Sequence, residues 1–475
     1  MIDPLTQQDH RGRLLRAGLP QSEAGQWLDA MESAQLPGPP KADGLESDAK
    51  AFGPLIARGR DFCEKMPLKS ERSPAEREAG ESIVLLMASL CRRFCRAHRE
   101  SIYRKLTGDY SRLVRVDELA WRAGELWPGL LPGKEEVARE AERMQRDKDG
   151  LELHQGIFFS QIFAGRESGR HLLHAMLRPK AESLELLAVF RRDGVADLGR
   201  SRAEVRGGAG YVITNNPRFL NAEDDSTNGP QETAIDLVLL HPGVQLGILR
   251  GERVEHPRYK GRRVFDSGIN LTHLYHGKIS YLFYLIRDLG LVNKLFRGLT
   301  HEEWEMDAPE ETLEKPWMAV VESHAIGGGC QLLLVVDYVI AESGSYFNLP
   351  ARKEGIIPGA ANLRLPRFLG ERLAREAILF DKTFYVENPE AARLINEVVP
   401  GNEMEQAVQR FVDNASSSGM VSASGNRKAL RVQSEPLEVY RRYLAVYCEE
   451  QARCHLSGQL IANLETHWSA KNRQL

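Results

Sequence analysis

The sequence has few cysteines, no long hydrophobic run and no excess of basic residues. Only six of its 475 residues are cysteine, too few for a disulfide framework, so we expect reduced thiols. No apolar run approaches the roughly 20 residues that span a bilayer, and MIDPLTQQDH lacks a signal-peptide pattern. The net charge of −3 argues against a nucleic-acid-binding surface. These absences predict a cytoplasmic protein without a membrane segment or a nucleic-acid partner.

The composition is that of a globular protein, with 42% apolar and 27% charged residues. Its length predicts two or three folded units. The residue pattern suggests a helical N-terminal domain (1–200), an α/β core (201–415) and a C-terminal helical segment (416–475). Residues 1 to about 50, rich in Pro, Gly and Gln, are predicted to be loosely ordered with one short helix. SSSGMVSASGN, after residue 415, is typical of a flexible connection.

One helix start is marked clearly in the N-terminal half. Ser73, Pro74 and Glu76 stand where a cap, a first-turn proline and a capping-box acid belong. Apolar residues then recur at helical spacing and predict one buried stripe: Ile83, Leu86, Met87, Leu90 and Phe94.

Near residue 200 the pattern changes to short β-type runs separated by Gly, Pro and Asn, namely GYVITNN, DLVLLHP, QLGILRG and RRVFDSG. Helical segments stand between and after them, notably ISYLFYLIRDLGLVNKLF and CQLLLVVDYVIAE. This alternation predicts an α/β unit.

The most informative segment follows an apolar strand at residues 318–321. The strand leads into Gly327, Gly328 and Gly329, and a helix is predicted directly after them. Glycines allow a ligand to approach the backbone closely, and unpaired N–H groups at a helix start favour negative charge. A flexible turn would look the same, but GIIPGA at residues 355–360 favours a binding loop.

Three segments, in this order, resemble the crotonase (enoyl-CoA hydratase/isomerase) superfamily: YVITNNPRFLNAED, RRVFDSGINLTHL and HAIGGGCQL. The resemblance spans about residues 205–415. It implies an α/β crotonase fold, a ClpP/crotonase-type spiral of ββα units, which here carries a helical N-terminal domain and a helical C-terminal tail.

The resemblance also implies an oxyanion hole made by the backbone N–H groups of Ile269 and Gly328. A thioester oxygen gains negative charge as its α-carbon loses a proton. Two fixed N–H donors in a dry pocket stabilise that enolate, and losing one typically costs about 3 kcal/mol.

Two acids that the hydratases of this superfamily use are absent. Their positions hold Gln331 and Ala351, and neither an amide nor a methyl group titrates. Glu354 is nearby but three residues out of register. Ordinary hydration is therefore not expected.

This departure, with the helical N-terminal half, is similar to a branch of cofactor-independent dioxygenases that serve glycopeptide-antibiotic biosynthesis. The similarity implies that (3,5-dihydroxyphenyl)acetyl-CoA and O₂ give 3,5-dihydroxyphenylglyoxylate, a precursor of dihydroxyphenylglycine, and free CoA, with no metal and no flavin. An electron-rich enolate can pass an electron to O₂ directly.

Particular residues follow from the same resemblance. Glu223, Arg287 and Gln331 would bind the ring hydroxyls, although an acidic turn or a helix arginine is as often solvated surface. An oxygen pocket would be lined by Ile269, Leu271, Ala351 and Ile356. The basic stretch ERVEHPRYKGRRVF precedes the oxyanion loop and would supply phosphate contacts. Coenzyme A would be held by His256, Ser267, Gly268, Asn270, Leu271 and Thr272.

Other readings stay open at this point. Cys91, Cys95 and His98 share a helical face but lack a fourth metal ligand, so we predict no metal site. An isomerase or thioester hydrolase using Glu354 or His324, or a non-catalytic acyl-CoA-binding protein, would also lack both acids. The resemblance further implies a homo-oligomer built on trimers, with a hexamer as one form.

Overall fold

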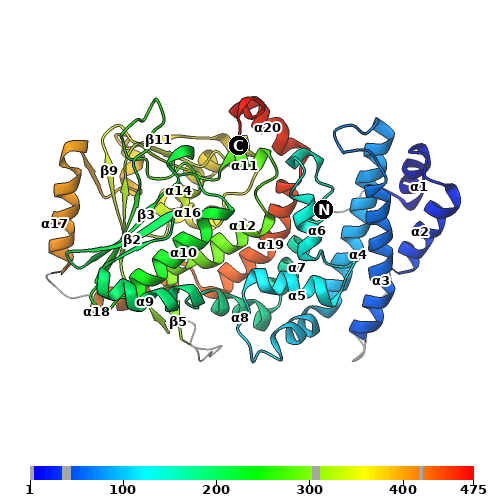
Figure 1. Ribbon diagram of the computed structural model, residues 1–475, viewed down its shortest axis with the longest axis horizontal. Helices are drawn as coiled ribbons and strands as arrows, with labels where there is room; N and C mark the ends of the chain where they lie inside the picture. The colour runs from blue at the N-terminus through cyan, green and yellow to red at the C-terminus, as the bar shows by residue number, and fades with distance from the viewer. Residues whose placement is uncertain (1–4, 35–43, 302–310, 417–420) are drawn as a thin grey trace.

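The computed structural model describes residues 5–34, 44–301, 311–416 and 421–475. Its N-terminal part consists of helices, most of which lie to one side of the sheets, whereas the last of them, α9, packs beside α10 (Asp225–Leu240) and β1 (Val195–Asp197) (Figure 1). These helices are α1 (Gln7–Arg16), α2 (Gln21–Ser33), α3 (Gly44–Glu64), α4 (Pro74–Thr107), α5 (Val116–Leu126), α6 (Lys134–Glu140), α7 (Glu152–Ala164), α8 (Arg166–Met176) and α9 (Ala181–Asp193).

The expectation of a loosely ordered start with one short helix was wrong. Helices α1 and α2 both form before residue 35, and α3 begins at Gly44. Helix α1 has a capping box between Thr6 and Asp9, and α2 buries Trp27 and Leu28. Polar composition hid two short amphipathic helices whose stability comes from packing on neighbours. Most of LPGPPKADG lies outside the described residues.

Helix α4 begins where its capping signals predict. The backbone N–H of Glu76 donates to Oγ of Ser73, and Oε2 of Glu76 accepts from the N–H of Ser73. The helix ends at Gly108, which is left-handed, as expected of a C-terminal glycine. The prediction is confirmed.

The main sheet has seven strands in the order β1-β2-β3-β4-β7-β9-β12. Its first two pairings are antiparallel and the other four are parallel. The strands are β1 (Val195–Asp197), β2 (Ser201–Arg206), β3 (Ala209–Thr214), β4 (Leu246–Gly251), β7 (Trp317–Val321), β9 (Tyr338–Glu342) and β12 (Glu397–Val399).

A second sheet has the order β11-β10-β8, and β5 pairs with β6 separately. The chain passes from β7 to β8 and from β9 to β10, so successive turns contribute to both larger sheets. These strands are β5 (Leu299–Thr300), β6 (Thr312–Leu313), β8 (His324–Ile326), β10 (Tyr346–Asn348) and β11 (Phe384–Tyr385). This is the crotonase spiral.

Helices cover and extend the sheets. The α-helices are α10 (Asp225–Leu240), α11 (Leu271–Tyr275), α12 (Tyr281–Ile286), α13 (Asn293–Arg297), α14 (Gly328–Leu333), α15 (Ala351–Glu354), α16 (Ala361–Phe380), α17 (Met404–Ser416), α18 (Val421–Ser434), α19 (Leu437–His455) and α20 (Gly458–Trp468). A π-helix, η3 (Arg287–Val292), joins α12 to α13. Short 3₁₀ turns are η1 (Gln145–Asp147), η2 (Pro217–Phe219), η4 (Pro389–Arg393), η5 (Gly401–Glu403) and η6 (Ala470–Asn472).

Several segment predictions need correction. DLVLLHP mostly belongs to α10, because a short apolar run fits a buried helix as well as a strand. The second half of CQLLLVVDYVIAE is strand β9. RRVFDSG forms only isolated bridges. Residues 421–426, expected as a flexible connection, begin α18, and residues 417–420 lie outside the described residues.

One apolar core joins the N-terminal helices to the wall of the site. It contains Phe94 and Phe158 from the first half, Tyr281 from α12 and Tyr447 from α19. The hydroxyl of Tyr281 donates to the carbonyl oxygen of Cys448 at 2.7 Å, and α19 runs beside α7 (Figure 1). The N-terminal helices therefore support α12 and η3, while the three-domain division stays a prediction.

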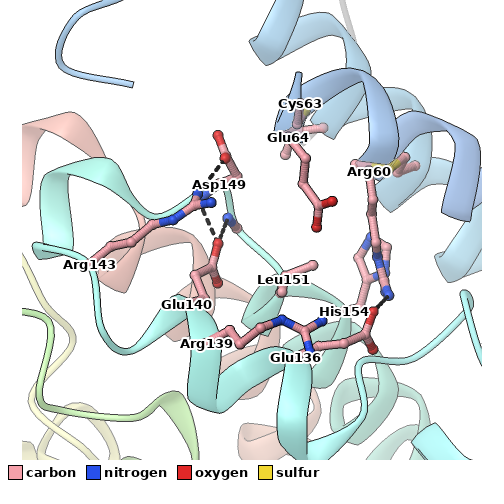
Figure 2. Close-up of a pocket in the computed structure, with 13 residues that line it drawn as sticks. Arg60, Cys63, Glu64, Glu136, Arg139, Glu140, Arg143, Asp149, Leu151 and His154 are labelled. Carbon is pink, nitrogen blue, oxygen red and sulfur yellow. Dashed lines mark hydrogen bonds and ion pairs between the residues drawn. The ribbon is translucent and has the colours of Figure 1, made fainter. Parts of the chain in front are cut away.

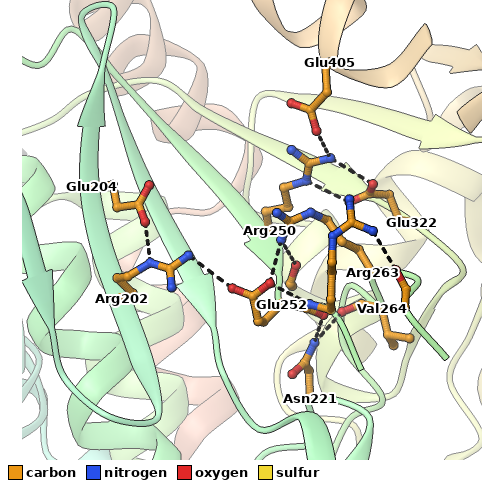
Figure 3. A network of polar contacts seen from close by, with 12 residues as sticks. Arg202, Glu204, Asn221, Arg250, Glu252, Arg263, Val264, Glu322 and Glu405 are labelled. Carbon is orange, nitrogen blue, oxygen red and sulfur yellow. Dashed lines mark hydrogen bonds and ion pairs between the residues drawn. The ribbon is translucent and has the colours of Figure 1, made fainter. Parts of the chain in front are cut away.

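A network of ion pairs fixes the chain where β4 ends (Figure 3). Arg250 on β4 forms two bonds of 2.8 Å with Glu322, and Arg263 binds Glu252 at 3.2 Å. The amide of Asn221 donates to the carbonyl oxygens of Glu252 and Val264. These contacts join four separate segments, and one of them, residues 263–264, comes directly before the predicted oxyanion loop.

Candidate active site

Residues 268–270 form a short bridge with Glu223. The N–H of Glu223 donates to the carbonyl oxygen of Gly268 at 2.8 Å, and the N–H of Asn270 donates to that of Glu223 at 2.7 Å. Oδ1 of Asp266 accepts from the N–H of Gly268 at 2.6 Å. Within the described residues, the N–H of Ile269 has no hydrogen-bond acceptor. Both of its neighbours are fixed, so this one donor is left for a ligand.

Gly328 is the first residue of α14, after Gly327 in a left-handed conformation with φ of 52°. The N–H of Gly327 is taken by the carbonyl oxygen of Asn348. In the part of the chain that the structure describes, nothing accepts from the N–H of Gly328. Ile269 and Gly328 line one cavity, so the two predicted donors are brought together.

Two glycines allow the loop at residues 268–270 to lie close to the start of α14. A Cβ on Gly268, whose φ is +72°, would lie 2.8 Å from the carbonyl oxygen of Ile326 and 3.1 Å from the nitrogen of Gly328. A Cβ on Gly328 would overlap Oε2 of Glu223. Only glycine fits either position without moving the neighbouring backbone or the buried acid.

The cavity that Ile269 and Gly328 line is small, and Arg287 is its central charge. The guanidinium donates to Oε2 of Glu223 at 2.7 Å, to Oε1 of Gln331 at 2.9 Å and to the carbonyl oxygen of Gly328 at 2.9 Å. Glu223 is 1% and Arg287 3% exposed. The solvated alternatives considered for these two residues were therefore wrong. The three residues predicted to bind the ring lie in one network.

Two further acids that the sequence did not single out surround Arg287. Asp288 lies 3.5 Å from its guanidinium, and Asp266 lies behind the oxyanion loop. Burial raises the pKa of Glu223 and of Asp288, and this effect is larger than the lowering of both pKa values by the charge of Arg287. Burial, with the charge of Glu223 added, raises the pKa of Asp266 well above its usual range. One permanent positive charge thus faces three carboxyls that tend to keep protons.

The free volume of this inner cavity is about 30 Å³. That is room for a diatomic molecule, whereas a cavity of about 150 Å³ is what holds a benzene-sized ring. An aryl group can therefore be accommodated only when lining side chains move.

A larger groove of about 550 Å³ adjoins the inner cavity, because Ile269 and Glu354 line both. Residues predicted to bind coenzyme A gather here: His256, Ser267, Asn270, Leu271 and Thr272. Gly268 is not among the described residues that line the groove, and its N–H donates to Oδ1 of Asp266.

The basic stretch divides between the groove and the protein's own acids. His256 and Arg258 line the groove. Arg262 pairs with Glu342 at 2.9 Å, and Arg263 pairs with Glu252. Two further cations of the groove, Arg218 and Arg473, were not predicted, since Arg473 comes from the distant C-terminal segment.

The four residues of the predicted oxygen pocket separate. Ile269 and Ile356 line the inner cavity, and Leu271 lines the groove. Ala351 is buried at the start of α15 and is not among the described side chains that line either space.

The sequence is similar to those of known proteins. A family model described as enoyl-CoA hydratase/isomerase matches residues 303–449. A (3,5-dihydroxyphenyl)acetyl-CoA 1,2-dioxygenase from Amycolatopsis orientalis is 42% identical over 407 residues, which cover 85% of this chain and 92% of the relative. The chain belongs to the crotonase (enoyl-CoA hydratase/isomerase) family.

Other members are more distant. A crotonyl-CoA hydratase from Syntrophomonas wolfei is 27% identical over 220 residues, covering 46% of this chain and 76% of the relative. The crystal structure of an enoyl-CoA hydratase from Mycobacterium avium subsp. paratuberculosis aligns with a TM-score of 0.47 at 18% identity, covering 59% of this chain and 99% of that one.

Within this crotonase fold, Glu354 lies at the candidate site, although in the sequence it is three residues out of register. It is 4% exposed, and it lies where the groove meets the inner cavity. It stands three residues after Ala351, the position expected for the hydratase acid, yet Glu354 and not Ala351 lines both spaces in the described structure.

His324 packs beside the oxyanion loop, as expected. Its Nε2 lies 2.8 Å from Oγ of Ser267, whose hydroxyl also lies 2.7 Å from the carbonyl oxygen of Leu220. Burial, helped by Arg258 and Arg262, lowers the pKa of His324 to about 4. The imidazole is therefore neutral at physiological pH.

Another cavity, of about 360 Å³, lies among the N-terminal helices (Figure 2). Its arginines face acids: Arg60 pairs with Glu136 at 2.9 Å and Arg143 with Asp149 at 3.0 Å. None of the residues predicted to form the site lines this cavity in the described structure.

The possible metal ligands are used otherwise. His98 pairs with Asp48 at 2.7 Å, and Cys91 and Cys95 are buried in the apolar core. Residues 5–34, 44–301, 311–416 and 421–475 contain no group of three or more His, Cys, Asp or Glu arranged to hold a metal. No helix of those residues is long and apolar enough to cross a membrane.

Proposed function

We propose that this protein is a cofactor-independent dioxygenase that converts (3,5-dihydroxyphenyl)acetyl-CoA and O₂ to 3,5-dihydroxyphenylglyoxylate and CoA. The observation that carries the proposal is that Ile269 and Gly328 line one cavity and that the N–H of each has no acceptor among the described residues, while the two hydratase positions hold no acid. The relative that is 42% identical bears the name of this activity.

The oxyanion hole accounts for the first step. When the thioester oxygen accepts hydrogen bonds from Ile269 and Gly328, charge moved from the α-carbon onto that oxygen is stabilised. Arg287 donates to the carbonyl oxygen of Gly328 and so holds the second donor in place. An aryl group on the α-carbon delocalises the same charge further.

The missing acids argue against hydration. Gln331 accepts a hydrogen bond from Arg287, and an amide cannot move a proton to or from water. Ala351 offers only a methyl group. With no acid to activate water at either position, the enolate is left to react with O₂.

The inner cavity has room for O₂ as it stands, and the polar groups for ring binding line it, although the ring enters only when lining side chains move. Ile269 and Ile356 form an apolar side beside the oxyanion hole that suits O₂. Glu223, Arg287 and Gln331 offer donors and acceptors for two phenolic hydroxyls. Oε1 of Glu223 has no hydrogen-bond partner among the described residues, so it can accept a hydrogen bond from a phenol hydroxyl.

Three finer features belong to the same proposal. The reaction uses neither metal nor flavin, because the enolate itself reduces O₂. The protein is cytoplasmic. It assembles as a trimer-based homo-oligomer, supported by exposed apolar side chains on its outer helices, Phe380, Leu430 and Val432. Light scattering during gel filtration measures the assembly.

The test is O₂ uptake by purified protein treated with chelator and checked for flavin. With (3,5-dihydroxyphenyl)acetyl-CoA we expect one O₂ consumed for each CoA released, and the arylglyoxylate as product. Binding of the thioester without uptake would remove the proposal. Phenylacetyl-CoA, which lacks both hydroxyls, is the matched substrate control and should react more slowly.

A second candidate is a thioester hydrolase or an isomerase. The contact between Ser267 and His324 beside the thioester position favours it, as does Glu354. Under nitrogen a hydrolase or isomerase keeps working and a dioxygenase stops. Tight binding without any turnover would instead indicate a non-catalytic acyl-CoA-binding protein.

A further inference from the structure

We infer that Glu354 is the catalytic proton acceptor, taking the α-proton of the thioester and returning it to the departing CoA thiolate. The inference rests on the proposed dioxygenase function. The N–H donors of the oxyanion hole stabilise an enolate but cannot accept a proton, so the reaction needs a separate proton acceptor.

Position is the first argument. Ile269 and Glu354 both line the groove and the inner cavity, so they mark the neck between them. A thioester whose oxygen is bound by Ile269 and Gly328 has its sulfur toward the groove and its α-carbon toward the inner cavity. Both carboxyl oxygens of Glu354 also face Gly327, because a Cβ there would lie 3.7 and 3.9 Å from them.

The second argument is that the carboxyl of Glu354 is uncommitted. Among the described residues, none forms a hydrogen bond or an ion pair with it. A buried acid without a partner is costly for a folded protein, and such groups concentrate at functional sites.

The competing groups around the neck have partners, although Oε1 of Glu223 has no hydrogen-bond partner among the described residues. Glu223 and Asp288 are tied to Arg287, and Nε2 of His324 to Ser267. Tyr284, beside Glu354 in the inner cavity, is a phenol whose pKa burial raises well above its usual range. Among the described acids that line the inner cavity, Glu354 is the one with no hydrogen bond or ion pair at either carboxyl oxygen, since Glu223 and Asp288 are both paired with Arg287.

Its proton affinity suits a two-way transfer. Burial, with the negative charge of Asp381 second, raises the pKa of Glu354 to about 8. An ordinary thiol has a pKa of about 8.5, so the proton passes to a CoA thiolate with little change in free energy. The same pKa means that the reactive carboxylate form increases as pH rises through 8.

The charged and titratable groups facing this neck come from several elements. Asp381 ends α16 and lies 3.9 Å from Lys353. From α20, the side chain of Asn463 contacts α15 through the carbonyl oxygen of Arg352, and it carries no charge. The cavity walls supply the others: Glu223, Tyr284, Arg287, Asp288 and Tyr447 inside, and Arg218, His256, Arg258, Tyr259, His324, Tyr346 and Arg473 in the groove.

One carboxylate, that of Glu354, can carry out every proton transfer in the reaction. An α-C–H bond breaks, the proton goes to Glu354, and the electron pair forms the enolate. O₂ takes two electrons as a C–O bond forms, giving a peroxide anion. That anion attacks the thioester carbon, the C–S bond breaks, and the thiolate takes the proton from Glu354. The second α-proton then goes to Glu354 as the O–O bond breaks, which gives the arylglyoxylate, and Glu354 releases this proton to solvent.

The experiment compares wild type with Glu354→Gln, which keeps shape and removes basicity. Two rates are measured with (3,5-dihydroxyphenyl)acetyl-CoA: exchange of the α-hydrogens with D₂O under nitrogen, and O₂ uptake in air. We expect Glu354→Gln to lower both rates at least 100-fold, the scale of general base catalysis, while binding of the thioester is unchanged.

Asp381→Asn is the matched variant. Its left-handed backbone, with φ of 60°, suits Asn. Removing this charge should lower the pKa of Glu354, so the pH midpoint of both rates moves to lower pH and the plateau stays. A merely structural role for Glu354 would not produce that shift.

Either rate within threefold of wild type in Glu354→Gln overturns the inference, as does an unmoved pH midpoint in Asp381→Asn. The two proposals can fail separately. If wild type exchanges its α-hydrogens through Glu354 but takes up no O₂, the dioxygenase function is wrong and the proton acceptor stands. If O₂ uptake is intact in Glu354→Gln, the function stands and the acceptor is wrong.

Discussion

The sharpest test of the oxyanion hole is Gly268→Ala, because the added methyl group would lie directly between the two loops that carry the donors. The backbone of Gly268 has a φ of +72°, which costs a non-glycine residue about 1–2 kcal/mol. The new Cβ would also lie 2.8 Å from the carbonyl oxygen of Ile326 and 3.1 Å from the nitrogen of Gly328. Both are backbone atoms, so a loop must shift.

That shift moves one N–H donor relative to the other. Loss of one oxyanion donor typically costs about 3 kcal/mol, or 10²–10³ in rate. We therefore expect Gly268→Ala to lower kcat for O₂ uptake by at least 100-fold. Its unfolding free energy should fall by about 1–2 kcal/mol from the backbone conformation alone.

Gly199→Ala is the matched control. Gly199 has nearly the same φ, +74°, and a Cβ there meets nothing within 4 Å. It should lose similar stability in urea unfolding and keep its activity. If kcat of Gly268→Ala stays within threefold of Gly199→Ala, the two N–H groups are not what stabilises the reacting oxygen.

Three further predictions concern charge. Arg287→Gln leaves buried acids without their cation and should lower the free energy of unfolding in urea by about 3–5 kcal/mol. The side chain of Arg262 is 52% exposed, so Arg262→Gln should lower that free energy by less than about 1 kcal/mol. Equal losses in the two variants would contradict this prediction. Burial alone would raise the pKa of Glu435, but its arginine partners lower it to about 2. Its contribution is thus complete above the unfolded pKa of about 4.5 and disappears as pH falls toward 2, so Glu435→Gln should reduce the stability difference between pH 6 and pH 3, as thermal unfolding would measure. Glu152 and Asp224, whose pKa values are also lowered to about 2, keep their own share of that difference. His256→Ala should raise KM about tenfold with kcat unchanged, and a substrate truncated to the pantetheine thioester should show no difference between the variant and wild type.

Local signals in the sequence were enough for several features. Ser73 and Glu76 predicted the start of α4, because a cap involves neighbours within one turn. The glycine loop and the absence of acids at Gln331 and Ala351 were readable as a motif at short spacing. The sequence was less informative where a short apolar run fits two structures, so DLVLLHP proved to be helix.

Tertiary structure alone decided which charges act together. Arg287 lies 64 residues from Glu223 and 44 from Gln331 in the sequence. Local periodicity does not predict that three positions so far apart lie together in the fold. The same holds for Arg473, which reaches the groove from the C-terminal segment. Whether a charged side chain is solvated or buried depends on which distant segments cover it.

The sequence by itself determined the superfamily, the oxyanion loop and the loss of the hydratase acids, because each is a short-range pattern. The folded chain decided that the N–H groups of Ile269 and Gly328 remain free, that one arginine faces three buried carboxyls, and that Glu354 stands between groove and cavity. These depend on closing long loops around a common point, and the packing that determines such closure is distributed over the whole chain.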